Sequence, residues 1–276
     1  NNNQSERSMG RTTKRPAGRP TRPAEPRQVG IAELADRVGR WLEVERFADY
    51  CPNGLQVEGT RPIRRLVSGV TANLALIDAA AELGADAVLV HHGWFWKGED
   101  ARLVGTRGER VRRLMASGMS LFAYHLPLDA HPSLGNNARL ASVLGIEVAG
   151  TGGDRDLVWH GRLEAPTDAV AFGRRLARRL GQRPLAVGAL DRPIERVAWC
   201  TGAAQDYLED AIALGADAFV SGEISERTTH LAREAGVVYF AAGHHATERY
   251  GVQALGEAIA EDCGIEHRFV DVPNPV

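Results

Sequence analysis

The chain has 276 residues, of which 44% are hydrophobic and 6% aromatic, and its formal net charge is −2. This composition is sufficient for one large or two medium domains, and no apolar run approaches the roughly 20 residues of a membrane-spanning helix. The cysteines at 51, 200 and 263 are widely spaced and form no CxxC pair. They argue against a zinc ribbon or a disulfide framework, so we expect a reduced, cytoplasmic protein without a membrane partner.

The start of the chain is strongly basic. Residues 1–28 carry seven basic and two acidic side chains, a net +5, which leaves −7 for the remainder. This segment is rich in Asn, Arg, Pro and Thr and has almost no apolar residues, so we predict a disordered basic tail. A basic tail can contact nucleic acid or acidic lipid, but the acidic body argues against nucleic acid lying across the outer surface of the fold.

Helical and strand patterns alternate after the tail. The helix predicted before Gly84 ends at that residue, because glycine readily adopts the left-handed conformation of a helix C-terminus. The strand that follows is continuously apolar, which is typical of a parallel sheet covered on both faces. In order, the patterns predict a helix, two strands, a helix and a strand, over residues 30–43, 55–57, 65–70, 72–83 and 87–90.

The same pattern recurs 131 residues further along the chain. Residues 65–94 and 196–225 align without a gap, and both contain Leu-Gly-Ala-Asp-Ala between a helix and a strand. Each copy is followed by one more helix and strand, within 111–124 and 228–241. A period this long that occurs twice indicates a duplicated β-α-β-α-β unit, so we predict an α/β fold with a pseudo-two-fold body.

We divide the folded part into a first α/β repeat unit (29–150), a small α/β insert (151–195) and a second α/β repeat unit (196–276). The insert contains a strand-like run at 158–163 and a helical pattern at 168–180. Its position between the two copies suggests a lid or an assembly surface.

Side chains capable of acid-base or metal chemistry cluster at the carboxyl ends of the predicted strands. They are His91, His92, His125 and Asp129 in the first copy, and Glu223, His244 and Glu248 in the second. His244 and Glu248 lie four residues apart where a strand gives way to a helix, so they share one helical face. Because ligands in open α/β sheets bind at strand ends, we expect the two sets to line one cleft.

Each of these signals is weak by itself. A His and a carboxylate four residues apart occur on many solvated helices, and adjacent histidines are often satisfied by backbone carbonyls. Asp129 has the context of a loop residue, and we expect Asn136 to cap the helix that follows. Neighbouring residues of an extended chain point to opposite sides, so His91 and His92 suit two metals, or a metal and a substrate, better than one chelated ion.

Three imidazoles and two carboxylates without a cysteine suit a pair of divalent ions such as Fe, Zn, Mn or Co. Two ions about 3.5–4 Å apart can deprotonate a shared water and bind a substrate oxygen, which favours hydrolysis at phosphorus or at an amide-like carbon. His125 and Glu223 are then candidates to carry the proton. The sequence has no Walker-type phosphate loop, which weakens the case for a GTP-specific enzyme.

Four stretches resemble the Nif-three-like family, also called GTP cyclohydrolase I type 2 homologues, with the bacterial YbgI-type branch most similar: LGADAVLVHHGWFWKG, YHLPLDAHPSLGNNARLASVLGI, SGEISE and AAGHHATERYG. The similarity runs from about Ile31 to the end of the chain. It implies a toroidal homohexamer, built as a trimer of dimers, with a dinuclear metal centre in each subunit. The ligand positions of the family, all unchanged here, fall on His91, His92, Asp129, His244 and Glu248.

The resemblance also implies an association with radiation resistance and with the breakdown of damaged nucleotides. We therefore expect a metal-dependent hydrolase of nucleotides or related small molecules. One alternative is a non-catalytic, metal-binding ring scaffold that contacts protein or nucleic acid. A further alternative, suggested by the family's second name, is a GTP cyclohydrolase.

Overall fold

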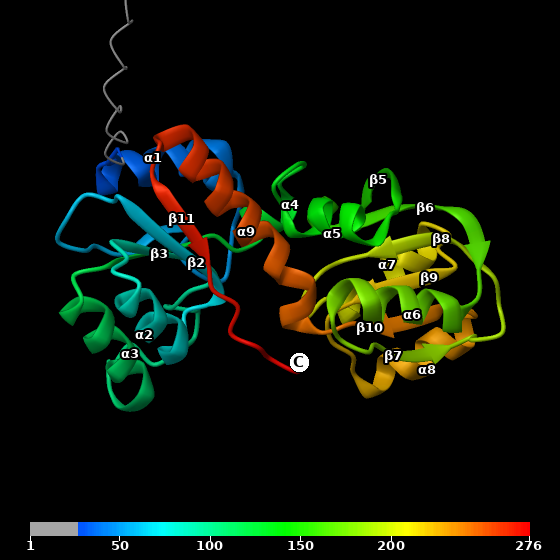
Figure 1. Cartoon of the computed structure of the whole chain (residues 1–276). Coiled ribbons are helices and arrows are strands. Elements are labelled where there is room, and N and C mark those ends of the chain that lie inside the picture. Colours follow the sequence, from blue (N-terminus) through cyan, green and yellow to red (C-terminus); the bar gives the residue numbers. More distant parts are fainter. Residues whose placement is uncertain (1–26) are drawn as a thin grey trace, which may run out of the picture.

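The computed structural model describes residues 27–276, which form two lobes joined by a long helix (Figure 1). The predicted disordered tail, residues 1–28, lies outside the described residues except for its last two. Those two already contact the fold, since the Arg27 amide donates to the Gly264 carbonyl and Gln28 accepts from the Arg64 side chain. Within residues 27–276, no helix has the length and apolar character of a bilayer span.

The first lobe is a five-stranded sheet with a pair of helices on each face. Its elements are α1 (Ile31–Trp41), β1 (Gly54–Val57), β2 (Arg65–Thr71), α2 (Leu74–Glu82), β3 (Ala87–His92), α3 (Gly105–Ala116), β4 (Ser120–Ala123), α9 (His244–Cys263) and β11 (Glu266–Phe269). The strand order is β1-β4-β3-β2-β11, with β1 antiparallel to its neighbour and the others parallel. Alternate side chains of the strands pack against α1 and α9 on one face and against α2 and α3 on the other.

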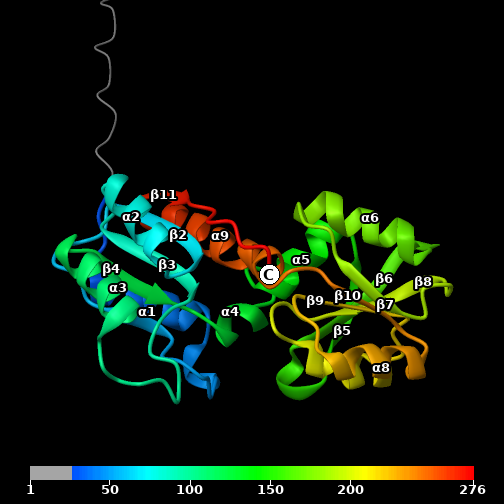
Figure 2. The ribbon, with the colours of Figure 1, turned by 90° about the horizontal axis from the view of Figure 1, so that it is seen from below.

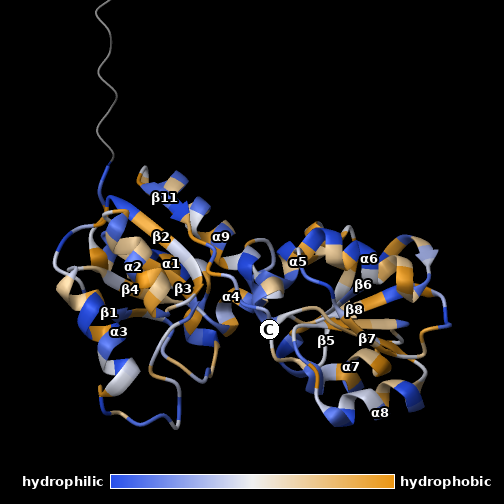
Figure 3. Ribbon diagram, turned by 60° about the horizontal axis from the view of Figure 1, so that its bottom comes forward, coloured by the Kyte–Doolittle hydropathy of each residue, from blue (hydrophilic) through white to orange (hydrophobic). Residues whose placement is uncertain are grey.

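The second lobe is a six-stranded sheet, also covered on both faces. Its elements are α5 (Asn136–Leu144), β5 (Glu147–Gly152), β6 (Val158–Thr167), α6 (Ala169–Leu180), β7 (Leu185–Gly188), β8 (Ile194–Trp199), α7 (Leu208–Ala213), β9 (Ala218–Ser221), α8 (Glu226–Ala235) and β10 (Val238–Ala241). The strand order is β5-β6-β8-β9-β10-β7. Helices α5 and α6 cover one face and α7 and α8 the other, and Figure 3 shows apolar residues along the central strands of both lobes.

The predicted duplication is confirmed. Strands β2, β3 and β4 of the first lobe correspond to β8, β9 and β10 of the second, and both trios are parallel. Corresponding aspartates even make the same contacts. The Asp86 carboxylate accepts hydrogen bonds from two backbone amides at the start of β2, and the Asp217 carboxylate accepts hydrogen bonds from two near the start of β8.

The segment predicted as an insert, 151–195, contains the expected strand and helix as β6 and α6. Its strands extend the second sheet, because β6 pairs with β8 and β7 pairs with β10. Near the end of the chain, β11 crosses back to pair with β2 in the first lobe. Both sheets therefore contain strands from more than one of the predicted units, since sequence spacing shows which strands exist but not which edges they join.

Three helices lie where the lobes meet: α4 (Leu126–Ala130), α5 and α9 (Figure 2). Helix α9 starts directly after β10 in the second lobe and packs its later turns, including Val252, Leu255 and Ile259, on the sheet of the first. The carboxyl ends of β3 and β10 are thereby brought to the same place, as predicted for a cleft formed by both copies.

Candidate metal centre

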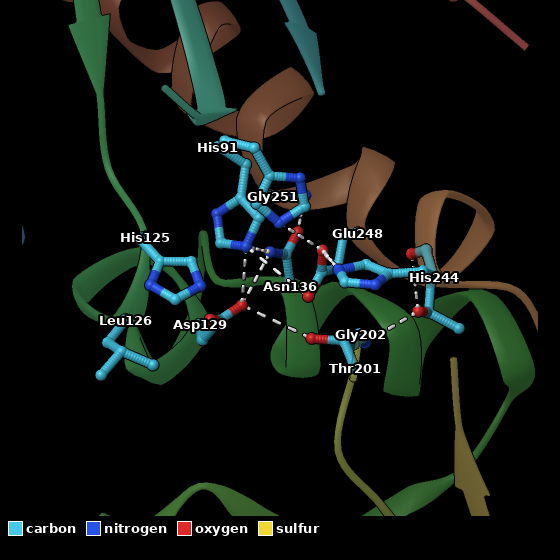
Figure 4. Close-up of polar contacts among 12 residues, drawn as sticks. His91, His125, Leu126, Asp129, Asn136, Thr201, Gly202, His244, Glu248 and Gly251 are labelled. Carbon is cyan, nitrogen blue, oxygen red and sulfur yellow. Dashed lines mark hydrogen bonds and ion pairs between the residues drawn. The ribbon is translucent and has the colours of Figure 1, made fainter. Parts of the chain in front are cut away.

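Five side chains from both lobes converge at the junction of β3, α4 and α9, and Figure 4 labels His91, Asp129, His244 and Glu248 among them. His91 and His92 are the last residues of β3, so the strand is two residues longer than predicted, and pairing of His92 with Thr71 in β2 sustains it. Asp129 lies on the short helix α4 rather than in a loop. Helix α9 begins at His244, as the spacing of His244 and Glu248 predicted.

Glu248 lies at the centre of the group. Its Oε1 is 3.6 Å from Nε2 of His91, and its Oε2 is 3.0 Å from Nε2 of His92 and 2.9 Å from Nε2 of His244. The remaining carboxylate, Asp129, places Oδ1 3.4 Å from Nε2 of His91. The five residues thus form two triads that share Glu248: His91 with Asp129, and His92 with His244.

Each of the three imidazoles makes a hydrogen-bond contact through its Nδ1, on the side of the ring away from Glu248. The partners are the Tyr124 carbonyl for His91 (2.8 Å), the Thr71 hydroxyl for His92 (3.1 Å) and the Glu223 carboxylate for His244 (2.7 Å). When Nδ1–H donates to such an acceptor, the lone pair of Nε2 is left for a metal. All three Nε2 atoms face Glu248, which is the arrangement of metal-binding histidines with fixed outer partners.

The residues present fit divalent cations. The Glu248 side chain is 4% exposed, and the groups that face its Oε2 are two imidazole nitrogens, those of His92 at 3.0 Å and His244 at 2.9 Å. A buried carboxylate is unfavourable unless a cation, either a proton on a histidine or a metal ion, compensates its charge. Imidazole nitrogens and carboxylate oxygens together are ligands suited to Zn, Fe and Mn.

Without a cation, the carboxylates retain protons on two of the imidazoles. Burial alone would lower the pKa of His91, but the charges of Asp129 and Glu248 outweigh burial and raise that pKa to about 9. Burial is likewise outweighed at His244, where Glu248 raises the pKa to about 9. Burial lowers the pKa of His92 to about 4. Burial opposes the ionised form of Glu248, yet the surrounding histidines hold its pKa well below the usual value.

The two residues predicted to carry protons occupy different positions around the centre. His125 precedes α4 and lines the neighbouring cavity, with its ring centroid 5.1 Å from that of His91 and its Nδ1 2.8 Å from Asp49. Glu223 contacts Nδ1 of His244 and is not among the residues that line the cavity. Glu223 therefore contacts the Nδ1 side of the candidate ligand His244, whereas His125 lines the cavity.

Asn136 does not cap its helix, contrary to the prediction. Gly135 occupies the cap position, and Asn136 is the first residue of α5. Its fully buried amide donates to Asp129 Oδ1 (2.8 Å) and accepts from the Gly251 amide of α9 (2.9 Å). The Thr201 hydroxyl contacts the same Asp129 oxygen at 3.4 Å. Asn136 therefore positions Asp129, a role that depends on contacts with segments distant along the chain.

A cavity of about 500 Å³ opens beside the triads. Its polar end is formed by His92, His244 and Glu248, and its sides by residues of both lobes, including Tyr50 and Tyr207. A concave site that combines a few converging polar groups with apolar and aromatic walls is typical of small-molecule binding.

The backbone of Gly202 lies so close to the Glu248 carboxylate that a larger residue would displace it, which provides a test of the centre. The φ of Gly202 is +72°, and a Cβ at this position would lie 2.0 Å from Glu248 Oε1. We expect Gly202→Ala to displace that carboxylate and weaken metal binding by about tenfold or more. Metal affinity should be measured by competition with a chromophoric chelator.

The matched control is Gly145→Ala, because Gly145 has a similar φ of +69° and an added Cβ there would meet nothing within 4 Å. Both variants bear the same backbone strain, and only the first intrudes on Glu248. Equal metal affinity in the two variants would contradict this close approach.

Comparisons with known proteins identify the family and support the fold. The sequence model of the DUF34/NIF3 (NGG1p interacting factor 3) family matches residues 29–275. A GTP cyclohydrolase 1 type 2 homolog of Allochromatium vinosum is 59% identical over 235 residues, covering 85% of this chain and 92% of the relative. The protein of the same name in Pseudomonas aeruginosa is 53% identical over 250 residues, covering 90% and 99%.

A solved structure of the protein ybgI, whose function is described as unknown, is 46% identical to this chain. It superposes with a TM-score of 0.86 over 90% of this chain and 100% of that one. A solved structure from Thermus thermophilus is 34% identical, with a TM-score of 0.82 over the same shares of the two chains. The α/β architecture is thus shared with solved relatives, and the chain belongs to the DUF34/NIF3 family.

Proposed function

We propose that this protein is a metal-dependent hydrolase that acts on a nucleotide or a related small molecule. The observation that carries the proposal is the shared carboxylate of Glu248, whose two oxygens face imidazoles of different triads at the end of a cavity. One buried group that faces two sets of ligands is suited to holding two cations side by side.

Divalent ions bound there would supply Lewis acidity and would lower the pKa of a water molecule. The protein's own contribution is position and proton transfer. His125 is the better placed of the two predicted proton carriers, because it lines the cavity and its contact with Asp49 fixes the ring. Glu223, through its contact with His244, is assigned an orienting role instead.

Support for a nucleotide as substrate comes from the cavity and from the relatives. The relatives in Allochromatium vinosum and Pseudomonas aeruginosa are named GTP cyclohydrolase 1 type 2 homologs, and the cavity has aromatic side chains on which a base can stack. Damaged nucleotides are the class that we favour within this group. GTP ring opening is a further candidate, since it too is hydrolysis at a carbon bound to nitrogen.

The test is a substrate screen on protein loaded separately with Mn, Fe or Zn. GTP and oxidised nucleotides should be offered, and products should be separated by chromatography. We expect turnover by the wild type and none by a His91→Ala, Glu248→Ala double variant, because that variant lacks ligands from both triads. A wild-type rate no higher than that of the double variant, with every metal, would count against a hydrolase.

A second candidate function is a metal-dependent ring scaffold, formed by the homohexamer that the family resemblance implies. An apolar groove of about 450 Å³ between α6 and β7, beside the exposed Val170 and Leu190, favours an assembly surface. In this case removal of metal with a chelator should lower the assembly mass measured by light scattering, while no substrate is consumed. An unchanged mass after chelation would contradict a metal-dependent ring.

A further inference from the structure

We propose that the cavity beside the triads recognises a nucleotide in two parts, with Trp96 as the surface on which its flat ring stacks and Arg155 as the group that binds its phosphate. The inference rests on the proposed hydrolase function and adds to it the residues that select the substrate. Neither residue belongs to the triads.

The cavity has a reactive end and an aromatic side. His92, His244 and Glu248 form the polar end, and the rings of Tyr50 and Trp96 line the side that belongs to the first lobe. Aromatic side chains stack on flat heterocycles whatever the pattern of donors and acceptors on the ring. A base bound against Trp96 would therefore lie next to the triads without using any of their ligands.

Backbone strain fixes Trp96 in that position. The residue before it, Phe95, has a φ of +65°, which is rare for a bulky side chain. The strained turn separates two tryptophans: Trp94 is buried and donates to the Ala72 carbonyl, whereas Trp96 lines the cavity. The Trp96 and His125 rings lie nearly perpendicular to each other, with their centroids 5.0 Å apart. Strain of this kind is retained mainly at functional sites.

A second strained turn carries Arg155. It lies between β5 and β6, and Arg155 and Asp156 have φ values of +56° and +55°. The guanidinium reaches from the second lobe to the first, where it lies 5.8 Å from the centroid of the Tyr50 ring. Leu157, two residues further along the chain, lines the cavity. The strained turn therefore holds Arg155 at the rim of the cavity.

The Arg155 guanidinium has donors available for an anion. Its contacts are an ion pair with Asp154 at 3.5 Å and a contact with the Ala48 carbonyl, also at 3.5 Å, and 39% of its side chain is exposed. A phosphate offers a guanidinium shorter and stronger paired hydrogen bonds than these. A ligand that satisfies Trp96, Arg155 and the triads together has a flat ring, an anionic group and a hydrolysable bond, which describes a nucleotide.

The experiment measures equilibrium binding of three probes by calorimetry: GMP, guanosine and ribose 5-phosphate. Trp96→Leu removes the flat ring but keeps an apolar side chain, and we expect it to weaken GMP and guanosine by about fivefold or more. Trp96→Phe should retain most of this binding, and ribose 5-phosphate should be unaffected by either variant. Arg155→Ala should weaken GMP and ribose 5-phosphate but not guanosine.

Arg174→Ala is the matched control, because Arg174 is an arginine of the second lobe that lies on α6, in the groove away from this cavity. The inference is overturned if wild-type protein binds none of the probes at millimolar concentration, or if Trp96→Leu and Arg155→Ala bind GMP as tightly as the wild type. Binding as expected without turnover of any nucleotide would contradict the hydrolase alone. Turnover with a KM unchanged in both variants would contradict the inference alone.

Discussion

Replacing Glu248 by Gln should leave the protein unable to retain metal at either triad. The substitution keeps the shape of the side chain but removes the charge that both triads share, since Oε1 faces His91 and Oε2 faces His92 and His244. Loss of an outer partner typically weakens a metal site about 10–100-fold, so loss of the central ligand should weaken both sites by more than about a hundredfold. Elemental analysis after dialysis measures this directly.

The control is Glu257→Gln, because Glu257 is an exposed acid on the same helix, α9. It should bind as much metal as the wild type. The metal-free fold of Glu248→Gln should survive, because an uncharged amide is less costly to bury than a carboxylate. Retention of one ion by Glu248→Gln would mean that the two triads do not share this carboxylate as a ligand.

The candidate ligands were predictable because they follow strands. His91 and His92 end β3, and His244 and Glu248 follow β10, so each pair lies where a parallel strand ends. Polar side chains at the carboxyl ends of strands line ligand sites in α/β sheets, and the duplication indicated two such edges that could face one another across one cleft. Asp129 was a candidate on the same ground although its own surroundings indicated a loop, and the motifs that resemble the family then placed it among the expected ligands.

The supporting residues were not predictable in the same way. Asn136 and Asp49 act through contacts with residues distant along the chain, such as the Gly251 amide for Asn136 and the His125 ring for Asp49. Local sequence assigns an Asn before a helical run to a cap, and only the packed structure shows that the cap is Gly135. The strands that extend the second sheet were missed as sheet partners for the same reason, because edge pairing depends on tertiary packing.

Metal affinity should rise steeply between pH 7 and pH 9. In the metal-free protein the pKa of His91 and the pKa of His244 are both raised to about 9, so each triad contains one imidazole that must lose a proton before it can bind a cation. Displacing one proton per ion makes each affinity increase about tenfold per pH unit in this range, and the product of the two about a hundredfold. Competition titrations at pH 6.5, 7.5 and 8.5 measure this slope.

The same protons make the metal-free protein respond to pH in the opposite direction. A histidine whose folded pKa is raised contributes stability that is complete below its unfolded pKa of about 6.5 and is lost as the pH passes through the folded value. The free energy of unfolding of the metal-free protein should therefore fall from pH 6.5 to pH 9.5, by an amount on the order of a few kcal/mol, and its melting temperature should fall with it.

The metal-loaded protein should not show this fall, because cations replace the protons as partners of Glu248 and Asp129. His244→Ala provides the internal check: only the triad of His91 is then complete, so one ion should bind, with the slope of a single proton. Metal affinity that does not change between pH 7 and pH 9 would mean that the imidazoles are already neutral, and that the carboxylates do not hold their charge in the metal-free site.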